Sequence, residues 1–420
     1  MRESIRFIHS ADLHIDSLFK TKGHLPQELL EQLRASTFEA FDRLIDACVQ
    51  NKVDFLIIAG DLYNEEIRSL KAQVHLRRGF ERLRKNDISV YISYGNHDFV
   101  KGNKHPIELP ENVRIFTNEH VNYFPFEKNG VAIAHIYGFS YETREVREKK
   151  VASYKREGGV DYHIGMLHGS VETNTEHDVY APFSIEELKD QGMDYWALGH
   201  IHKREILSED PPAIYPGNIQ GRSRKETGEK GCYLVENYHG TWKHTFLPLH
   251  SFTYETVEIE CNQIDAPDQL EKVLEEAKEG VEAHGTSIML TITLSANHSN
   301  LREWKLTGYI DEWVEIMNAS EDTSSHEWIW IEDVKIIDLS HWNETELLKG
   351  HHFTGELLRS VESLREKEIE NWLAPLFTHR KIHKYVQPLT EEEKEETLEE
   401  AKKMMVEHFM SSEKRQNHED

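Results

Sequence analysis

Five short polar clusters in the first half of the chain carry side chains that can bind metal ions. Each follows an apolar stretch typical of a β-strand, and glycine stands beside several of them. The clusters are Asp12-Leu13-His14, Gly60-Asp61, Gly95-Asn96-His97-Asp98, His168 and Gly199-His200-Ile201-His202. Because α/β folds place their sites at the carboxyl ends of neighbouring strands, we expect these side chains to meet. Glycine lets the backbone turn sharply and approach a ligand closely.

These residue types suit a centre of two divalent metal ions. A carboxylate can bridge two ions, and Asp61 is the natural bridge, whereas Asn96 adds a neutral oxygen. Two such ions, the carboxylates of Asp12 and Asp61 and a bridging hydroxide leave a net charge of about +1, which suits a phosphodiester anion; the ions would lie about 3.5–4 Å apart. Mixed imidazole and oxygen ligation favours Mn²⁺, Fe or Zn²⁺ over Mg²⁺ or Ca²⁺.

Alternating strand and helix patterns predict the layered α/β domain that positions these clusters, up to about residue 250. The expected strands are Ile5–His9, Asp54–Ala59, Ser89–Tyr94, Val131–Tyr137, Tyr162–Leu167, Tyr195–Leu198 and Gly231–Glu236. The expected helices are Leu29–Val49, Ile67–Lys85 and Ser184–Asp190. Proline and glycine in Asp210–Gly221 indicate a loop.

The pattern changes after about residue 250. A small α+β domain is indicated by strand-like Tyr254–Glu260, Ser287–Leu294 and Trp328–Ile337 with helical Asp268–Glu279 and Leu306–Ile316. After Asp338 the apolar residues recur at helical spacing, at Phe353, Leu357, Val361 and Leu364 and again at Leu398, Ala401, Met405 and Phe409. Thr390 with Glu393 predicts a capping box for the last helix. We therefore expect three parts, residues 1–250, 251–340 and 341–420.

Charge and composition restrict the classes of function. The 420 residues carry a net charge of −26, which argues against a chain that coats nucleic acid or anionic membrane indiscriminately. However, residues 1–250 hold 32 basic and 37 acidic side chains, whereas residues 251–420 hold 17 and 38. The acidic excess therefore lies outside the predicted metal site, and a local nucleic-acid contact remains compatible with the sequence.

Other global features predict a cytoplasmic protein without a membrane segment. The three cysteines form no Cys-x-x-Cys pair, so neither a disulfide framework nor a thiolate zinc site is expected. The N-terminus has no apolar signal-peptide core, and no run of 18 apolar residues occurs. The 26 histidines are an unusually large number, which favours metal binding; His9 is expected to be structural.

The five clusters, in this order, resemble those of the calcineurin-like metallophosphoesterases. Three further stretches resemble the DNA-repair exonuclease branch, namely the SbcD-type nuclease subunits and most closely the YhaO-like bacterial proteins. These stretches are His9-Ser10-Ala11-Asp12-Leu13-His14, Tyr180-Ala181-Pro182, and Tyr215-Pro216-Gly217 before Glu229-Lys230-Gly231. The resemblance covers the chain to about residue 250. It implies a four-layer αββα sandwich, followed by a small α+β capping domain and a helical C-terminal tail.

The same resemblance implies roles for individual residues. One metal ion would bind Asp12, His14, Asp61 and His202, and the second would bind Asp61, Asn96, His168 and His200. His97 would face the phosphate, where it stabilises transition-state charge or protonates the leaving oxygen. Asp98 either orients His97 or is a local turn residue. The nucleophile would be a metal-bridging hydroxide, so no covalent enzyme intermediate is expected.

The function that the resemblance implies is Mn²⁺-dependent hydrolysis of DNA, by the nuclease subunit of a repair complex. It further implies a homodimer and a partner ATPase of the SbcC type, which has a long coiled coil and would bind the C-terminal helices. Arg222 and Arg224 follow the metal motifs and are candidate contacts for substrate phosphate.

One position departs from the pattern of many nuclease members, in which a histidine stands three residues after Gly-Asp. This chain has Asn64 there, and asparagine can hydrogen-bond a phosphate but cannot act as an acid. Two alternatives therefore stay open: a phosphoesterase acting on nucleotides or other small phosphate esters, and a weakly active or inactive scaffold that regulates a coiled-coil ATPase.

Overall fold

The computed structural model divides the chain into two compact units, residues 1–338 and 339–420, which are considered separately. In the first unit the structure describes residues 3–64, 68–102, 106–172, 180–238, 240–281, 285–296, 300–325 and 327–338. In the second it describes 348–349, 353–362, 372–375, 389, 394, 397–398 and 401–402, including helix α8 (Phe353–Glu362). The predicted capping box and the positions Met405 and Phe409 lie outside the described residues.

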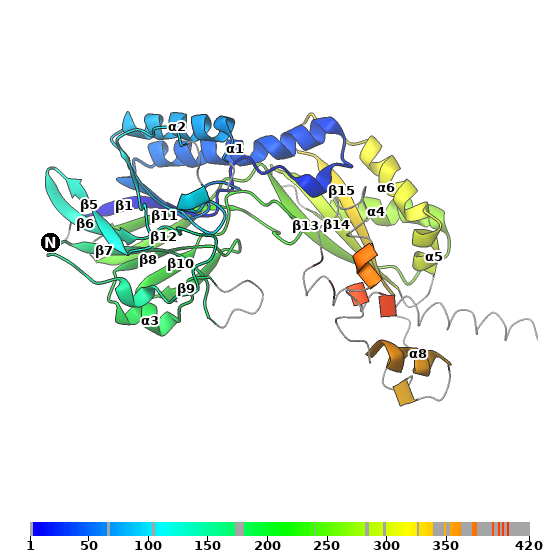
Figure 1. The fold of residues 1–420 in the computed structure, drawn as a ribbon. Coiled ribbons are helices and arrows are strands. Elements are labelled where there is room, and N and C mark those ends of the chain that lie inside the picture. Colours follow the sequence, from blue (N-terminus) through cyan, green and yellow to red (C-terminus); the bar gives the residue numbers. More distant parts are fainter. Residues whose placement is uncertain are drawn as a thin grey trace, which may run out of the picture. The chain divides into compact units, whose positions relative to one another are not determined.

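Two six-stranded sheets form the centre of the first unit (Figure 1). The first has the order β12 (Thr241–Pro248), β11 (Gly231–Tyr238), β1 (Ile5–Ser10), β2 (Phe55–Ala59), β3 (Ser89–Ser93) and β4 (Val113–Ile115). The second has the order β5 (Asn122–Lys128), β6 (Val131–Gly138), β7 (Tyr162–His168), β8 (Tyr195–Gly199), β10 (Pro212–Tyr215) and β9 (Glu205–Glu209). Strands β1 to β4 are parallel, as are β6, β7, β8 and β10, so the carboxyl ends of each set share one edge.

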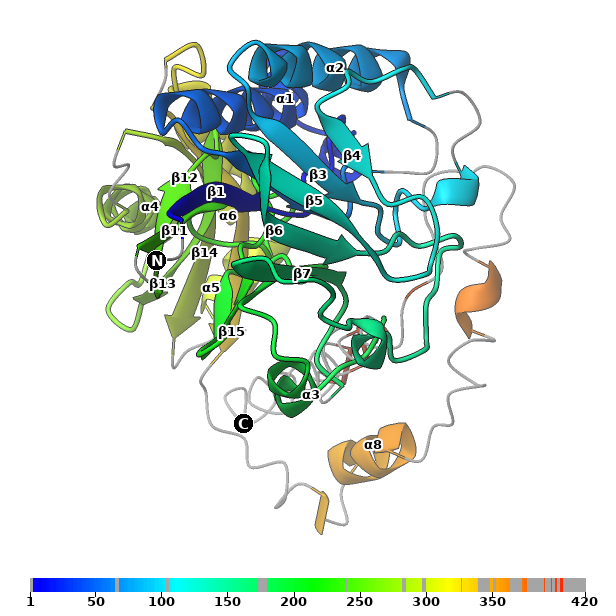
Figure 2. The same cartoon turned by 90° about the vertical axis from the view of Figure 1, so that its left-hand side faces the viewer.

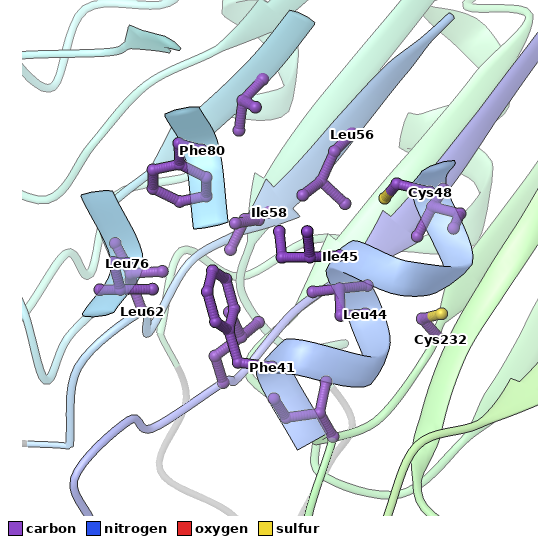
Figure 3. Packing of buried hydrophobic residues seen from close by; sticks show 14 of the residues in the cluster. Phe41, Leu44, Ile45, Cys48, Leu56, Ile58, Leu62, Leu76, Phe80 and Cys232 are labelled. Atoms are coloured by element: carbon purple, nitrogen blue, oxygen red, sulfur yellow. The ribbon is translucent and has the colours of Figure 1, made fainter. Parts of the chain in front are cut away.

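Side-chain alternation along the strands generates four layers. Leu56 and Ile58 of β2 pack against α1 (Gln27–Gln50) and α2 (Leu70–Arg84), as Figure 3 shows with Phe41 and Phe80. The intervening Phe55 and Ile57 belong to the core between the two sheets. On the outer face of the second sheet lies α3 (Ile185–Asp190). Figure 2 shows α1 and α2 at the top and α3 at the bottom, so the predicted αββα sandwich is confirmed.

A third sheet follows in the same unit, formed by β13 (Phe252–Glu260), β14 (Ser287–Ala296) and β15 (Ile329–Asp338), all parallel. The connections contain α4 (Leu270–Glu279), α5 (Asn300–Leu306) and α6 (Tyr309–Ala319), which cover one face. On the other face Met289 and Trp328 pack with Leu29 and Leu33 of α1. The sheet is therefore anchored on the helix that also covers the first sheet.

Two sequence predictions about elements are wrong. The helix expected over Leu306–Ile316 is α6, which begins only at Tyr309, after Gly308 with φ of 85°, and α5 before it was not expected. The loop expected over Asp210–Gly221 contains β10, a short buried strand that pairs parallel with β8. Strands β4, β5, β9 and β12 were not expected either, and Pro125 explains the case of β5, since proline is confined to sheet edges.

No helix in the described part of the chain has both the length and the apolar character needed to cross a bilayer.

Candidate metal centre

The loops that follow β1 and β2 run side by side and present three of the predicted ligands. The amide of Asp12 donates to the carbonyl of Gly60 at 3.1 Å, and that of His14 donates to the carbonyl of Asp61 at 3.0 Å. Asp12, His14 and Asp61 have φ of 50°, 44° and 50°, and His200 has 96°. Non-glycine residues rarely adopt such angles, which cost of order 1–3 kcal/mol each and cluster at functional sites.

The first group of donor atoms involves His14 and His202. Their Nε2 atoms lie 3.0 Å apart, and Nε2 of His14 lies 3.8 Å from Oδ2 of Asp61. Asp12, His14 and His202 each offer a ligand atom within 4.8 Å of the others. Two imidazole nitrogens at this distance share either a proton, which one donates to the other, or a metal cation. This donor set therefore fits a metal ion that accepts imidazole and carboxylate ligands.

The second group is centred on His168. Its Nε2 lies 3.5 Å from Oδ2 of Asp61 and 3.0 Å from Oδ1 of Asn96, and its Nδ1 lies 3.9 Å from Oδ1 of Asp12. The ring of His200 packs edge-on against His168 at 5.3 Å, and the His200 amide donates to Asp12. All seven predicted ligands thus converge on one site. Their distribution between two ions stays a prediction, and Asp12 as well as Asp61 lies close to both groups.

Charges in this cluster compensate one another. Burial raises the pKa of Asp12 to about 6. At Asp61 burial acts in the same direction, but His168 and His14 outweigh it and hold the pKa well below its usual range. Burial opposes protonation of His168, yet the carboxylates of Asp61 and Asp12 raise its pKa to about 9. Buried carboxylates and imidazoles in such contact are tolerable because each stabilises the charge of its neighbours.

Two glycines that follow strands, Gly60 and Gly95, allow the close contact between His168 and Asp61. A Cβ atom on Gly95 would lie 2.3 Å from Oδ1 of Asp61 and 2.5 Å from Nε2 of His168. A Cβ atom on Gly60, whose φ is 90°, would lie 2.0 Å from Nδ1 of His168. That same Nδ1 bonds the carbonyl of Ala59 at 3.0 Å, which fixes the ring. The glycines therefore make room for His168 at the end of β2.

His97 lies beside the predicted ligands. Its amide donates to Oδ1 of Asp61 at 3.0 Å, and its ring packs edge-on against His14 at 5.0 Å. Its Nδ1 lies 3.1 Å from the carbonyl oxygen of Asn64, which can only accept, so Nδ1 carries a proton, and Nε2 can donate to a substrate when the ring is doubly protonated. Burial lowers the pKa of His97.

Asp98 has another role than that of orienting the His97 ring. Its Oδ1 accepts from the amide of Gly95 at 2.7 Å, and its Oδ2 accepts from the amides of Leu62 and Tyr63 at 2.7 and 3.3 Å. The side chain therefore joins the loops after β2 and β3. Burial, with the nearby Asp61, raises its pKa to about 7.

Sequence reasoning missed Glu226. The Nδ1 atom of His202 donates to Oε1 of Glu226 at 2.7 Å, while Oε2 accepts from the amide of Arg222 at 2.6 Å and from Asn218 at 2.9 Å. His202 and Arg222 outweigh burial and hold the pKa of Glu226 below its usual range. The segment 222–230 contains two glutamates, Glu226 and Glu229, and only the fold selects between them.

The two arginines predicted to contact phosphate differ in position, since only Arg222 lies at the site. Nη1 of Arg222 donates to Oδ1 of Asn64 at 2.5 Å, and its Nη2 lies 3.5 Å from Nδ1 of His202, so both residues belong to the site. Arg224 instead pairs with Asp333 of β15 at 2.5 Å.

His9 is structural, as expected. It is buried, and its ring nitrogens contact the hydroxyl of Tyr195 at 3.0 Å and the carbonyl of Leu198 at 3.1 Å.

The chain is similar in sequence to known phosphoesterases and DNA-repair proteins. The family model of the calcineurin-like phosphoesterases matches residues 5–204. The chain is 38% identical over 405 residues to the uncharacterized metallophosphoesterase YhaO of Bacillus subtilis, covering 96% of this chain and 97% of that one. It is 24% identical over 419 residues to the DNA double-strand break repair protein Mre11 of Archaeoglobus fulgidus, covering 87% and 88%. The same-named protein of Methanocaldococcus jannaschii is 28% identical over 271 residues, covering 61% and 67%.

Among solved structures, the chain matches a dimetal phosphatase from Danio rerio at a TM-score of 0.35 and 12% identity, over 59% of this chain and 98% of that one. It matches TT1561 of Thermus thermophilus at a TM-score of 0.33 and 11% identity, over 58% and 99%.

Proposed function

Because the chain belongs to the calcineurin-like metallophosphoesterases, we propose that it is a metal-dependent nuclease that hydrolyses phosphodiester bonds in DNA. The observation that carries the proposal is the convergence of the seven side chains predicted as ligands after β1, β2, β3, β7 and β8, with His97 and Arg222 beside them. DNA is favoured over other esters by two relatives named as DNA double-strand break repair proteins.

The side chains have separable tasks in this mechanism. Two divalent ions, when bound, supply a nucleophilic hydroxide and stabilise the attacking and leaving oxygens. The predicted ligands would hold these ions, and we propose Mn²⁺ for both. The Asn64 carbonyl fixes the His97 ring, and in the doubly protonated ring Nε2 would donate to a phosphate oxygen or give its proton to the leaving oxygen, which leaves the ring neutral. Asp98 and the strand-end glycines hold the loops in place.

The test is a comparison of two substrates with full-length, Mn²⁺-loaded protein. Cleavage of linear duplex DNA is measured beside hydrolysis of a simple phosphomonoester, with and without the partner ATPase. We expect DNA cleavage that depends on metal. If DNA stays intact in both conditions while the monoester is hydrolysed, the nuclease proposal is wrong.

A second candidate, hydrolysis of nucleotides or other small phosphate esters, is favoured by Asn64. This residue stands where many nuclease members carry a histidine, and its side chain accepts from Arg222 and from Ser17. The metal chemistry is the same for both candidates, so the substrate comparison decides between them.

We also propose a cytoplasmic homodimer whose C-terminal helices bind a coiled-coil ATPase of the SbcC type. The support is the apolar spacing of residues 398, 401, 405 and 409 within an acidic segment. Deletion of residues 341–420 is expected to abolish co-purification with the ATPase and to leave metal binding intact. Retained association would contradict this assignment of the binding segment.

A further inference from the structure

The guanidinium of Arg222 is fixed beside the metal centre from several directions. Its Nη1 donates to Oδ1 of Asn64 at 2.5 Å, and the same oxygen accepts from the hydroxyl of Ser17 at 2.9 Å. The Arg222 amide donates to Oε2 of Glu226 at 2.6 Å. The main chain and the end of the side chain of Arg222 are therefore both fixed. Because a free arginine side chain loses much conformational entropy when it binds a ligand, this fixation lowers the free-energy cost of binding.

The positive charge of Arg222 is only partly balanced. Its side chain is 19% exposed, and its Nη2 lies 3.8 Å from Oε1 of Glu226. That oxygen already accepts from His202 at 2.7 Å, and the other oxygen accepts from Asn218 and from the Arg222 amide. Among the described residues, Nε of Arg222 has no hydrogen-bond partner. A guanidinium stays charged in proteins, so this partly exposed side chain offers positive charge to an anion, although its Nε is buried.

Asn64 connects Arg222 with His97. The backbone carbonyl of Asn64 accepts from Nδ1 of His97, and its side-chain oxygen accepts from Arg222. The Nη2 atom of Arg222 also lies 3.5 Å from Nδ1 of His202, which is one of the predicted ligands. One residue thus places two groups that suit phosphate oxygens next to the predicted metal ligands.

We propose that Arg222 binds a non-bridging phosphate oxygen of the substrate at the metal centre, and that Asn64 is the positioning residue that holds it there. Arg222 would supply the positive contact on the side where many nuclease members carry a histidine. The planar guanidinium can donate two parallel hydrogen bonds to a phosphate. This inference depends on the proposed phosphoesterase site, but it applies whether the substrate is DNA or a small ester.

The first experiment measures binding of inorganic phosphate to the full-length, Mn²⁺-loaded protein by isothermal titration calorimetry. Arg222→Met is expected to bind phosphate about 10- to 100-fold more weakly, the range for loss of a charge-assisted hydrogen bond. The matched control is Arg224→Met, in the same loop, whose native side chain pairs with Asp333. Its phosphate affinity is expected to stay within about twofold of that of the wild type. Manganese content is measured for each variant and is expected to be unchanged.

Equal phosphate affinities for Arg222→Met and Arg224→Met, both loaded with metal, would overturn the proposal. If Arg222→Met does not fold, Arg222→Lys is measured in its place. Lysine keeps the positive charge but cannot donate two parallel hydrogen bonds, so this variant is expected to bind phosphate about tenfold more weakly. Affinity equal to that of the wild type would again overturn it. A wild type that binds phosphate with this dependence on Arg222 but leaves DNA intact would contradict only the nuclease proposal.

The positioning role of Asn64 is tested by a double-mutant cycle. Asn64→Ala is expected to weaken phosphate binding severalfold in the wild type and to have no further effect in Arg222→Met. A purely structural role would give the same loss in both backgrounds. That result would remove Asn64 from the proposal.

Discussion

The Nδ1 atom of His202 and the Oε1 atom of Glu226 are joined by a hydrogen bond of 2.7 Å. With Nδ1 engaged as the donor, Nε2 is the nitrogen of His202 that can bind a metal ion, and it lies 3.0 Å from Nε2 of His14. A carboxylate of this kind orients a metal-binding imidazole and raises its basicity, and its loss typically costs 10- to 100-fold in metal affinity. Glu226 therefore belongs to the candidate site although it would not contact the metal.

Replacement of Glu226 is expected to weaken metal binding. Glu226→Ala should lower the affinity for Mn²⁺ about 10- to 100-fold, because the His202 ring loses its partner. Glu226→Gln should lose less, because its amide oxygen can still accept from Nδ1. Titration of metal-free protein with Mn²⁺ measures the effect. Glu229→Gln is the control, since Glu229 is exposed in the same segment. Wild-type affinity in Glu226→Ala would contradict the proposed role of Glu226.

His97→Ala is expected to reduce turnover without loss of metal. A positioned acid or base contributes about 10²- to 10⁴-fold, and removal of this ring leaves the His97 amide free to keep its bond to Asp61. Turnover of the better of the two substrates and the manganese content are measured together. His120→Ala, at an exposed position, is the control. Loss of manganese in parallel with activity would instead assign His97 a role in metal binding.

Gly95→Ala is expected to disrupt the centre sterically. The added Cβ would lie 2.3 Å from Oδ1 of Asp61 and 2.5 Å from Nε2 of His168, so at least one of these side chains must move. Such overpacking costs about 1–3 kcal/mol and should reduce the bound manganese. Gly159→Ala is the control, because a Cβ atom there meets no atom within 4 Å. Equal metal content and equal melting temperature in the two variants would contradict this prediction.

The position of the site was predictable because its residues follow buried strands. Asp61 and His168 follow β2 and β7, which belong to different sheets. Parallel pairing gathers the strand ends within each sheet at one edge, and the packing of the two sheets brings these edges together, so that His168 contacts the Ala59 carbonyl. Loop residues were less predictable. The partner of His202 depends on how segment 222–230 folds back, and nothing in its spacing distinguishes Glu226 from Glu229.

Short elements were also missed, for a related reason. Strand β10 has only four residues and follows a proline, so its identity as a strand depends on pairing with β8 rather than on its own pattern. Gly308 similarly makes α6 begin at Tyr309 and not at Leu306, where the helical pattern starts. Local composition determines strongly apolar elements, whereas tertiary pairing determines short ones.

His9 predicts a pH dependence of stability that is separate from metal binding. The ring is buried, with Nε2 donating to the Leu198 carbonyl and Nδ1 accepting from the Tyr195 hydroxyl, and burial lowers its pKa to about 3. In the unfolded chain the pKa is about 6.5. Below that value His9 binds a proton in the unfolded chain but stays neutral in the folded protein. The free energy of unfolding therefore falls as the pH falls from 6.5 toward 3. Between pH 7 and pH 5 the loss from this residue is about 2 kcal/mol.

The measurement is urea unfolding of the metal-free protein at pH 7 and pH 5. His9→Gln is expected to be less stable than the wild type at pH 7, because it loses the packed ring, but to lose about 2 kcal/mol less between the two pH values. Other titrating groups are common to both proteins and cancel in the difference. His120→Gln changes an exposed histidine and should keep the wild-type dependence. If His9→Gln and the wild type lose the same stability between pH 7 and pH 5, the buried ring is protonated in the folded protein, and its bond to the Leu198 carbonyl outweighs the burial.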